Sequence, residues 1–158
     1  MFIIDGTNLL WTTRDWPEGP QVASEEQLCQ ILNQYFADIH QQCEIVFDGT
    51  RPADRNAFAG IYHLEIIHAG YDQEADDVIR GKVLADTAPK RLTIVSTDHE
   101  VRDAATGRKA SVLRCEEFWE QVLTHLRKKP KKKEPPQKRG GSITDSETDQ
   151  WMDLFGLE

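Results

Sequence analysis

Acidic side chains in this sequence stand where short apolar runs end. Asp5 and Asp48 each follow such a run directly, Asp98 follows another after Thr97, and one further run is followed by a group of four acids: Asp72, Glu74, Asp76 and Asp77. Carboxylates gathered in one place repel one another unless a cation binds among them. Hard oxygen ligands favour Mg²⁺ or Mn²⁺, and such ions can activate water against a phosphodiester. The spacing therefore indicates a divalent-metal site suited to phosphodiester cleavage.

Each of these acids also has a simpler interpretation. An aspartate after a strand is a common helix cap or turn former, which explains Asp72 well and leaves Asp48 open. That interpretation does not explain why four strand ends all carry acids. Helical spacing places Glu74 and Asp77 on one face and turns Asp76 about 100° away. One residue of the Asp76–Asp77 pair is therefore expected to face a metal, unless both lie in the first turn.

The positioning elements follow from the apolar pattern. Continuous apolar or β-branched runs are typical of strands buried on both faces, and they occur at residues 2–4, 44–47, 63–68, 92–96 and 111–113. Helical patterns lie between most of these runs, which predicts an α/β fold with a mostly parallel sheet covered on both sides. Because ligands bind at the carboxyl ends of parallel strands, the acids are expected to meet at one edge.

Capping signals set the expected helix starts. Ser24 opens a Ser-x-x-Glu/Gln capping box, and Thr97 opens a Thr-x-x-Glu box directly after the fourth strand. A further helix is expected to start near Asp72, and another to run from residue 115 to about 126. The segment after the first strand, which holds Trp11 and Trp16, is expected to be a loop.

Charge divides the 158 residues into three parts. Residues 1–126 carry a net charge of −10, residues 127–139 carry eight Lys or Arg and one Glu, and residues 140–158 carry five acids and no Lys or Arg. This division predicts a globular domain over 1–126, a basic Lys/Pro/Gly linker over 127–141 and an acidic tail over 142–158. An apolar patch at Trp151–Phe155 in that tail is expected to form a short helix. It would dock on a partner protein or on the chain's own domain.

Localisation is predicted from absences in the sequence. No apolar run is long enough to span a bilayer, and the N-terminus has no basic region before its apolar residues. The three cysteines are scattered and form no CxxC pair, which favours free thiols in a reducing compartment. We therefore expect a cytoplasmic protein with no membrane partner.

Four motifs, in order, resemble a known family. Residues 2–10 (FIIDGTNLL) are similar to the opening strand and loop of NYN domains, and residues 45–49 (IVFDG) are similar to their second strand. Residues 75–79 (ADDVI) resemble their acidic helix, and residues 94–98 (IVSTD) resemble their last acidic strand end. The closest resemblance is to the YacP-like branch of these PIN-like nucleases, and it covers roughly residues 1–126. Four motifs in the right order are far more specific than any one alone.

The resemblance implies a PIN-like sheet and metal-dependent cleavage of RNA. It implies metal-site roles for Asp5, for one or both of Asp76 and Asp77, and for Asp98. It suggests that Asn8 orients a ligand or a water and that Asp103 holds a fourth acidic position. The best-described YacP-like proteins resemble endoribonucleases that act on messenger RNA at the ribosome, which makes the ribosome a candidate partner.

RNA contacts are expected from aromatic and basic residues near the acids and in the basic segment. The candidates are Trp11, Arg14, Trp16, Arg51, Arg55, Lys131, Lys132 and Lys133. For the tryptophans, ordinary packing against the core explains the sequence equally well. The acidic net charge and the tail support an alternative function, a non-catalytic RNA- or ribosome-binding adaptor on the same fold. The full set of acids favours the enzyme, because a pure binder has no reason to carry them.

Overall fold

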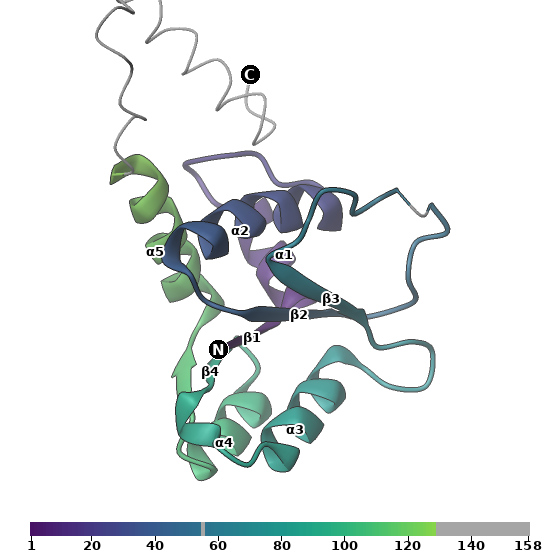
Figure 1. The fold of residues 1–158 in the computed structure, drawn as a ribbon, viewed down its shortest axis with the longest axis vertical. Helices are drawn as coiled ribbons and strands as arrows, with labels where there is room; N and C mark the ends of the chain where they lie inside the picture. The colour runs from purple at the N-terminus through teal and green to yellow at the C-terminus, as the bar shows by residue number, and fades with distance from the viewer. Residues whose placement is uncertain (55, 129–158) are drawn as a thin grey trace, which may run out of the picture.

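A single sheet of five parallel strands organises the protein (Figure 1). The computed structural model describes residues 1–54 and 56–128. The strand order is β3-β2-β1-β4-β5, and the strands are β1 (Phe2–Asp5), β2 (Cys43–Phe47), β3 (Leu64–His68), β4 (Thr93–Val95) and β5 (Ser111–Leu113). All five strands expected from the sequence are present, with ends that differ by at most one residue from the expected ones. The predicted α/β fold with a parallel sheet is confirmed.

Strand β1 lies at the centre of the sheet. Ile4 is in register with Ile45 of β2 and with Val95 of β4, and all three side chains are fully buried. Burial on both faces explains why these strands are continuous apolar runs rather than alternating ones. Because every strand is parallel, the carboxyl ends of β1, β2, β3 and β4 lie at one edge of the sheet.

Helices cover both faces of the sheet (Figure 1). Helices α1 (Gly6–Arg14), α2 (Glu25–Ile39) and α5 (Cys115–Lys128) lie on one face, and α3 (Ala75–Ala85) and α4 (His99–Gly107) lie on the other. A short 3₁₀ helix at Pro89–Arg91 precedes β4. No helix within the described part of the chain is long and apolar enough to cross a membrane. The three cysteines are buried and unpaired, as expected.

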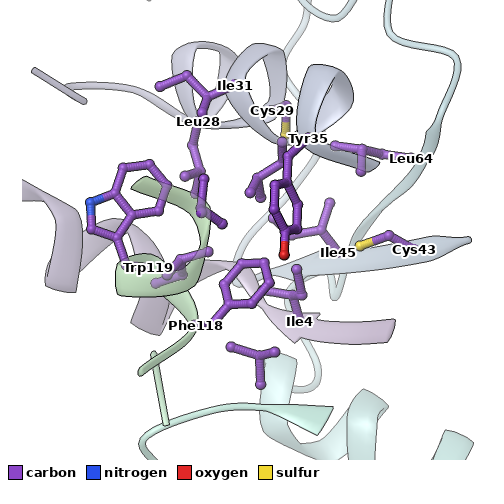
Figure 2. Packing of buried hydrophobic residues seen from close by; sticks show 14 of the residues in the cluster. Ile4, Leu28, Cys29, Ile31, Tyr35, Cys43, Ile45, Leu64, Phe118 and Trp119 are labelled. Carbon is purple, nitrogen blue, oxygen red and sulfur yellow. The ribbon is translucent and has the colours of Figure 1, made fainter. Parts of the chain in front are cut away.

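The two faces have different cores. Under α2 and α5 the core is aromatic: the rings of Phe36 and Phe118 stack with centroids 6.1 Å apart, and Tyr35 meets Phe118 edge-on at 5.8 Å. Figure 2 shows Tyr35 and Phe118 beside Ile4 of the central strand, with Trp119 farther along the same cluster. Under α3 and α4 the core consists of smaller side chains such as Ile79, Val101 and Ala105. We call the first cluster the aromatic core.

Helix α1 corrects the expectation of a loop after the first strand. Its residues include Gly6, Thr12 and Thr13, which have low helix propensity, so local pattern alone does not indicate a helix there. Tertiary contacts override that preference. Asp5 caps the helix by accepting a hydrogen bond from the Asn8 N–H at 3.1 Å. A side chain at Gly6 would come within 2.6–2.9 Å of the side chains of Phe47 and Ile45, so glycine permits the close approach of α1 to β2.

Two expected helix starts are also corrected. Helix α3 begins at Ala75 rather than near Asp72, because the carboxylate of Asp48 accepts the Ala75 N–H at 2.7 Å and holds the first turn there. Helix α4 is capped by Asp98 rather than Thr97, since Asp98 Oδ1 accepts the N–H groups of the first turn. The Ser24 cap of α2 is confirmed, with the Gln27 N–H donating to its hydroxyl at 3.2 Å.

Several expectations fall outside the described residues. Helix α5 runs to Lys128, so all but the first two residues of the basic segment lie beyond it. The described residues also leave out the acidic tail with Trp151–Phe155, the candidates Lys131, Lys132 and Lys133, and Arg55.

Candidate active site

Five carboxylates gather at the carboxyl edge of the sheet. Asp76, Asp98 and Glu100 each offer an oxygen atom, and these three atoms lie within 4.8 Å of one another. Asp5 lies close enough to the group that the charges of Asp48, Asp76 and Asp98 all raise its pKa. We call Asp5, Asp48, Asp76, Asp98 and Glu100 the acid cluster. The structure thus brings together acids that follow three strands and acids from the first turns of α3 and α4.

Asp5 is the most deeply buried member, with only 4% of its surface exposed. Burial raises its pKa to about 6, the Asn8 N–H opposes this shift, and the charges of Asp48, Asp76 and Asp98 add to it. A carboxylate in this setting is held ionised at neutral pH against both desolvation and repulsion. Positive charge nearby would relieve both costs.

A polar network connects Asp5 to Asp98. The Asn8 side-chain amide donates to Asp5 Oδ2 at 2.9 Å and to the Ser96 hydroxyl oxygen at 3.3 Å. Ser96 is completely buried, and its oxygen also accepts the Asp98 N–H at 3.0 Å. Asn8 therefore orients the Asp5 carboxylate and links it through Ser96 to the turn that carries Asp98.

The adjacent acids Asp76 and Asp77 have different roles in the structure. Asp76 faces Asp98 and Glu100, and its Oδ1 atom is buried with no hydrogen-bond partner among residues 1–54 and 56–128. Asp77 is turned away: it accepts the Glu74 N–H at 3.0 Å and pairs with Arg80. These two contacts lower the pKa of Asp77. The expected divergence of the two side chains is present even though both lie in the first turn of α3.

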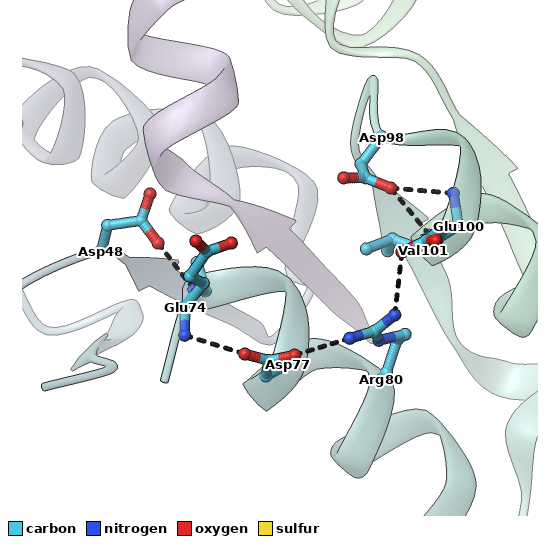
Figure 3. Close-up of polar contacts among 8 residues, drawn as sticks. Asp48, Glu74, Asp77, Arg80, Asp98, Glu100 and Val101 are labelled. Atoms are coloured by element: carbon cyan, nitrogen blue, oxygen red, sulfur yellow. Dashed lines mark hydrogen bonds and ion pairs between the residues drawn. The ribbon is translucent and has the colours of Figure 1, made fainter. Parts of the chain in front are cut away.

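Arg80 of helix α3 forms an ion pair with Glu100 of the acid cluster. Figure 3 shows its guanidinium between Asp77 and Glu100, and the distance to Glu100 Oε2 is 3.1 Å. In the same view Asp48 and Asp98 lie on opposite sides, with the start of helix α3 between them. Arg80 thereby holds Glu100, which is exposed, in a defined place beside the buried acids.

Asp48 and Glu74 border the cluster and also have structural contacts. The backbone N–H of Asp48 donates to the Thr7 hydroxyl at 2.8 Å, and its carboxylate caps α3 through Ala75. Glu74 precedes α3, and the charges of Asp76 and then Asp48 raise its pKa. The capping interpretation of Asp48 is therefore correct, although its charge still contributes to the cluster.

Asp103 lies apart from the acid cluster. Its exposed carboxylate pairs with His99 at 3.3 Å, one turn along α4. Glu100, on the first turn of the same helix, is the acid that stands with Asp76 and Asp98. The geometry therefore places Glu100, and not Asp103, beside the strand-end acids.

Three helix N-termini point at the acid cluster. Asp5, Glu74 and Asp98 are the N-cap residues of α1, α3 and α4. A helix N-terminus carries roughly half a positive charge, which stabilises nearby anions. The same N-termini favour phosphate groups. They offset part of the repulsion among the acids without supplying a charged side chain.

The donor set fits a divalent cation. Its members are hard carboxylate oxygens, the ligand type that Mg²⁺ and Mn²⁺ prefer. The buried, unpartnered Asp76 Oδ1 lies beside the other two carboxylates, and a buried acceptor without a partner is costly. An acidic cluster able to hold a metal ion is therefore present, in agreement with the prediction from the sequence.

The candidate RNA contacts separate into different environments. Trp11 on α1 is 62% exposed, and the Arg14 guanidinium lies 4.9 Å from the centre of its ring. Trp16 is partly buried against the aromatic core, so packing explains it. Arg51 is exposed in the loop after β2.

Sequence reasoning did not single out Glu100, Ser96 or Arg80. The Thr-x-x-Glu pattern explains Glu100 as part of a capping box, although its position two residues after Asp98 indicates that both belong to one helix start. Ser96 ends the apolar run of the fourth strand, and nothing in its sequence position indicates a contact with Asn8. Arg80 lies three residues after Asp77, a spacing that allows an ion pair on a helix. Its contact with Glu100 joins α3 to α4 and needs the tertiary structure.

The fold is shared with known structures. A crystal structure of Rae1 (YacP) from Bacillus subtilis superposes with a TM-score of 0.65 at 18% identity, covering 98% of this chain and 87% of that chain. A structure of its W164L mutant superposes with a TM-score of 0.59 at 19% identity, covering 80% of this chain and 76% of the other. At these identities the likeness shows the fold. No curated protein matches the sequence.

The family is shown by the sequence as a whole. The model of the YacP-like NYN domain family matches residues 2–154, which extends past the segment that carries the four motifs. Domains of this family are typically nuclease-like and act on RNA. A match of this extent, together with the parallel sheet and the carboxylate cluster, shows that the chain belongs to the YacP-like NYN domain family.

Proposed function

We propose that this protein is a metal-dependent endoribonuclease that cleaves single-stranded RNA at the acid cluster. The observation that carries the proposal is the convergence of Asp76, Asp98 and Glu100 beside the buried Asp5. Family membership supports RNA as the substrate. A strongly acidic site is a poor place for RNA phosphates unless cations bind there, so the charge itself argues for a metal.

The chain's own residues would hold Mg²⁺ or Mn²⁺ through Asp76, Asp98 and Asp5, with Glu100 beside them and Asp77 outside the group. When bound, the ion would supply charge neutralisation and activation of water for in-line attack on phosphorus. Asn8 orients the Asp5 carboxylate, and Ser96 fixes the turn of Asp98. Arg80 positions Glu100. The N-termini of α1, α3 and α4 favour the phosphodiester anion at this edge.

The rest of the chain extends the proposal. We propose that the nuclease domain of residues 1–126 is followed by a basic linker, 127–141, that adds sequence-independent affinity for RNA or the ribosome. Trp151–Phe155 in the acidic tail would bind a protein partner. The protein would act in the cytoplasm, on messenger RNA.

The test is cleavage of a mixed single-stranded RNA pool by the full chain, with Mn²⁺ and with EDTA. Wild type is expected to cleave only with Mn²⁺, and Asp98→Asn is expected to lose that cleavage. Asparagine is as good an N-cap as aspartate, so loss of helix α4 does not account for the effect. Asp5→Asn is expected to behave in the same way.

Asp103→Asn is the matched control, because it removes one acid from the same helix without touching the acid cluster. It should cleave like wild type. Cleavage by wild type that persists in EDTA, or near-normal activity of Asp98→Asn, would contradict the metal site. Tight RNA binding by wild type without cleavage under any metal would favour the adaptor function instead.

A further inference from the structure

Two aromatic side chains are strongly exposed on segments that leave the acid cluster. Trp11 is 62% exposed and Tyr71 is 91% exposed. An exposed aromatic ring contributes little to stability, and beside a nucleic-acid site it can stack a base. The part of the chain that the structure describes has one other strongly exposed aromatic residue, Tyr62, and it precedes β3, at the opposite edge of the sheet.

Trp11 lies one helical turn after Asn8, whose side chain contacts Asp5 of the acid cluster. It follows Asn8 by three residues on α1, so the two side chains share a helix face. Asn8 itself donates to Asp5 and to Ser96, which follows β4. Arg14, a further turn along, lies over the Trp11 ring. The face of α1 that leaves the acid cluster therefore carries an aromatic ring and then a guanidinium.

Tyr71 is held near the cluster from the other side. The Gly70 N–H donates to the Gly49 carbonyl at 2.8 Å, and this contact joins the loop after β3 to the loop after β2. Gly49 adopts a left-handed conformation, with φ +85, directly after Asp48 of the cluster. Tyr71 therefore directly follows a residue whose backbone is bonded to Gly49, the neighbour of Asp48. In the strand order β3 lies two strands from β1, whereas Asn8 leans toward β4 on the opposite side.

We propose that Trp11 and Tyr71 are base-stacking platforms on the two sides of the acid cluster, with Arg14 holding a phosphate beside Trp11. The ligand is extended single-stranded RNA whose bases on either side of the cluster stack on these rings. Bases in a duplex are already stacked on one another and leave no free face for a ring at this position. The inference rests on the proposed function for its substrate class. It adds the path of the bound RNA, which crosses the carboxyl edge of the sheet from the β3 side toward α1.

The binding test uses a fluorescein-labelled single-stranded RNA of about 15 nucleotides. Ca²⁺ replaces Mn²⁺, and a gel checks that the RNA stays intact. Anisotropy titrations compare the full-length wild type with Trp11→Ala and Tyr71→Ala. Each alanine variant is expected to weaken binding about tenfold, the size of one lost base stack. Trp11→Phe and Tyr71→Phe should stay within about twofold of wild type, because a ring remains.

Two controls separate stacking from other effects. Tyr62→Ala removes an aromatic side chain that is 85% exposed at the opposite edge, and it should bind like wild type. An abasic oligonucleotide of the same length should bind equally to wild type and to the two alanine variants, since it has phosphates and no bases. Unchanged affinity of both alanine variants for the normal RNA overturns the proposal. Equal losses on the normal and abasic probes also overturn it.

Cleavage with Mn²⁺ is measured in parallel so that the two proposals fail separately. If wild type does not cleave, yet Trp11→Ala and Tyr71→Ala lose base-dependent binding, the platforms stand and the nuclease function falls. If wild type cleaves and both variants bind and cleave normally, the function stands and the platforms fall.

Discussion

The acid cluster and the aromatic core are built on opposite principles, although both contact the central strand. In the aromatic core, Phe36, Phe118 and Tyr35 fill the space over Ile4 with ring contacts that favour folding. In the acid cluster, a buried Asp5 is surrounded by like charges, and one oxygen of Asp76 has no partner among the described residues. The difference teaches that stability is concentrated in one region of this fold and unrelieved charge in another. Substitutions in the two regions should therefore have opposite consequences.

The largest expected effect is in the aromatic core. Phe118→Ala should lower the free energy of unfolding by about 4 kcal/mol, because it removes a buried ring and leaves a cavity. Urea denaturation followed by circular dichroism measures this. Leu84→Ala is the control: Leu84 is exposed on α3, and its truncation should change stability by less than about 0.5 kcal/mol. Equal effects of the two variants would mean that the aromatic core does not dominate stability.

A smaller effect, on activity, should separate two neighbouring acids. Asp76→Asn should reduce Mn²⁺-dependent RNA cleavage by more than about 100-fold, more than the loss of a group that only supports a metal ligand. Asp77→Asn, which changes an acid bound to Glu74 and Arg80, should stay within about tenfold of wild type. Initial rates at saturating Mn²⁺ provide the comparison. A larger loss in Asp77→Asn than in Asp76→Asn would reverse the assignment of the two side chains.

The smallest expected effect is a gain in stability at the cost of activity. In EDTA at neutral pH, Asp5→Asn should stabilise the fold by about 2 kcal/mol, since it removes a charge held against burial and repulsion. The pKa of Asp5 is raised to about 6, so the folded state binds a proton more readily than the unfolded state. Wild type should therefore gain stability relative to the variant as pH falls through 6 toward 4, and lose it again as pH rises.

Urea titrations of both proteins at several pH values from 4 to 8 measure that difference. The gap should shrink to a small remainder by pH 4, where folded Asp5 is neutral and the unfolded carboxyl is about half protonated. A gap that is constant with pH, or a variant less stable than wild type at neutral pH, would show that Asp5 carries no stored repulsion.

Much of the fold was predictable because the strands are buried on both faces. Their apolar runs are continuous, so their order along the chain and the parallel sheet followed from pattern alone. The capping box at Ser24 marked α2 correctly, since its hydrogen bond depends only on neighbouring residues. Helix α1 was not predictable in this way. It includes the poor helix formers Gly6, Thr12 and Thr13, and it exists because Asp5 caps it and Leu9 is buried beneath it.

The candidate site divides along the same line. The sequence by itself determined which acids stand near strand ends, and hence that Asp5, Asp48, Asp98 and one or both of Asp76 and Asp77 meet at one edge, because parallel strands deliver their carboxyl ends together. Only the tertiary structure decided that Asp76 faces the cluster while Asp77 pairs with Arg80, and that Glu100 joins it while Asp103 pairs with His99. The Asp77–Arg80 and His99–Asp103 pairs each lie within one helix, but the meeting of Asp76 with Glu100 depends on the packing of α3 against α4, and the Arg80–Glu100 bond spans twenty positions. Spacing along one helix determines the direction of a side chain, but which group it meets depends on how the helices pack.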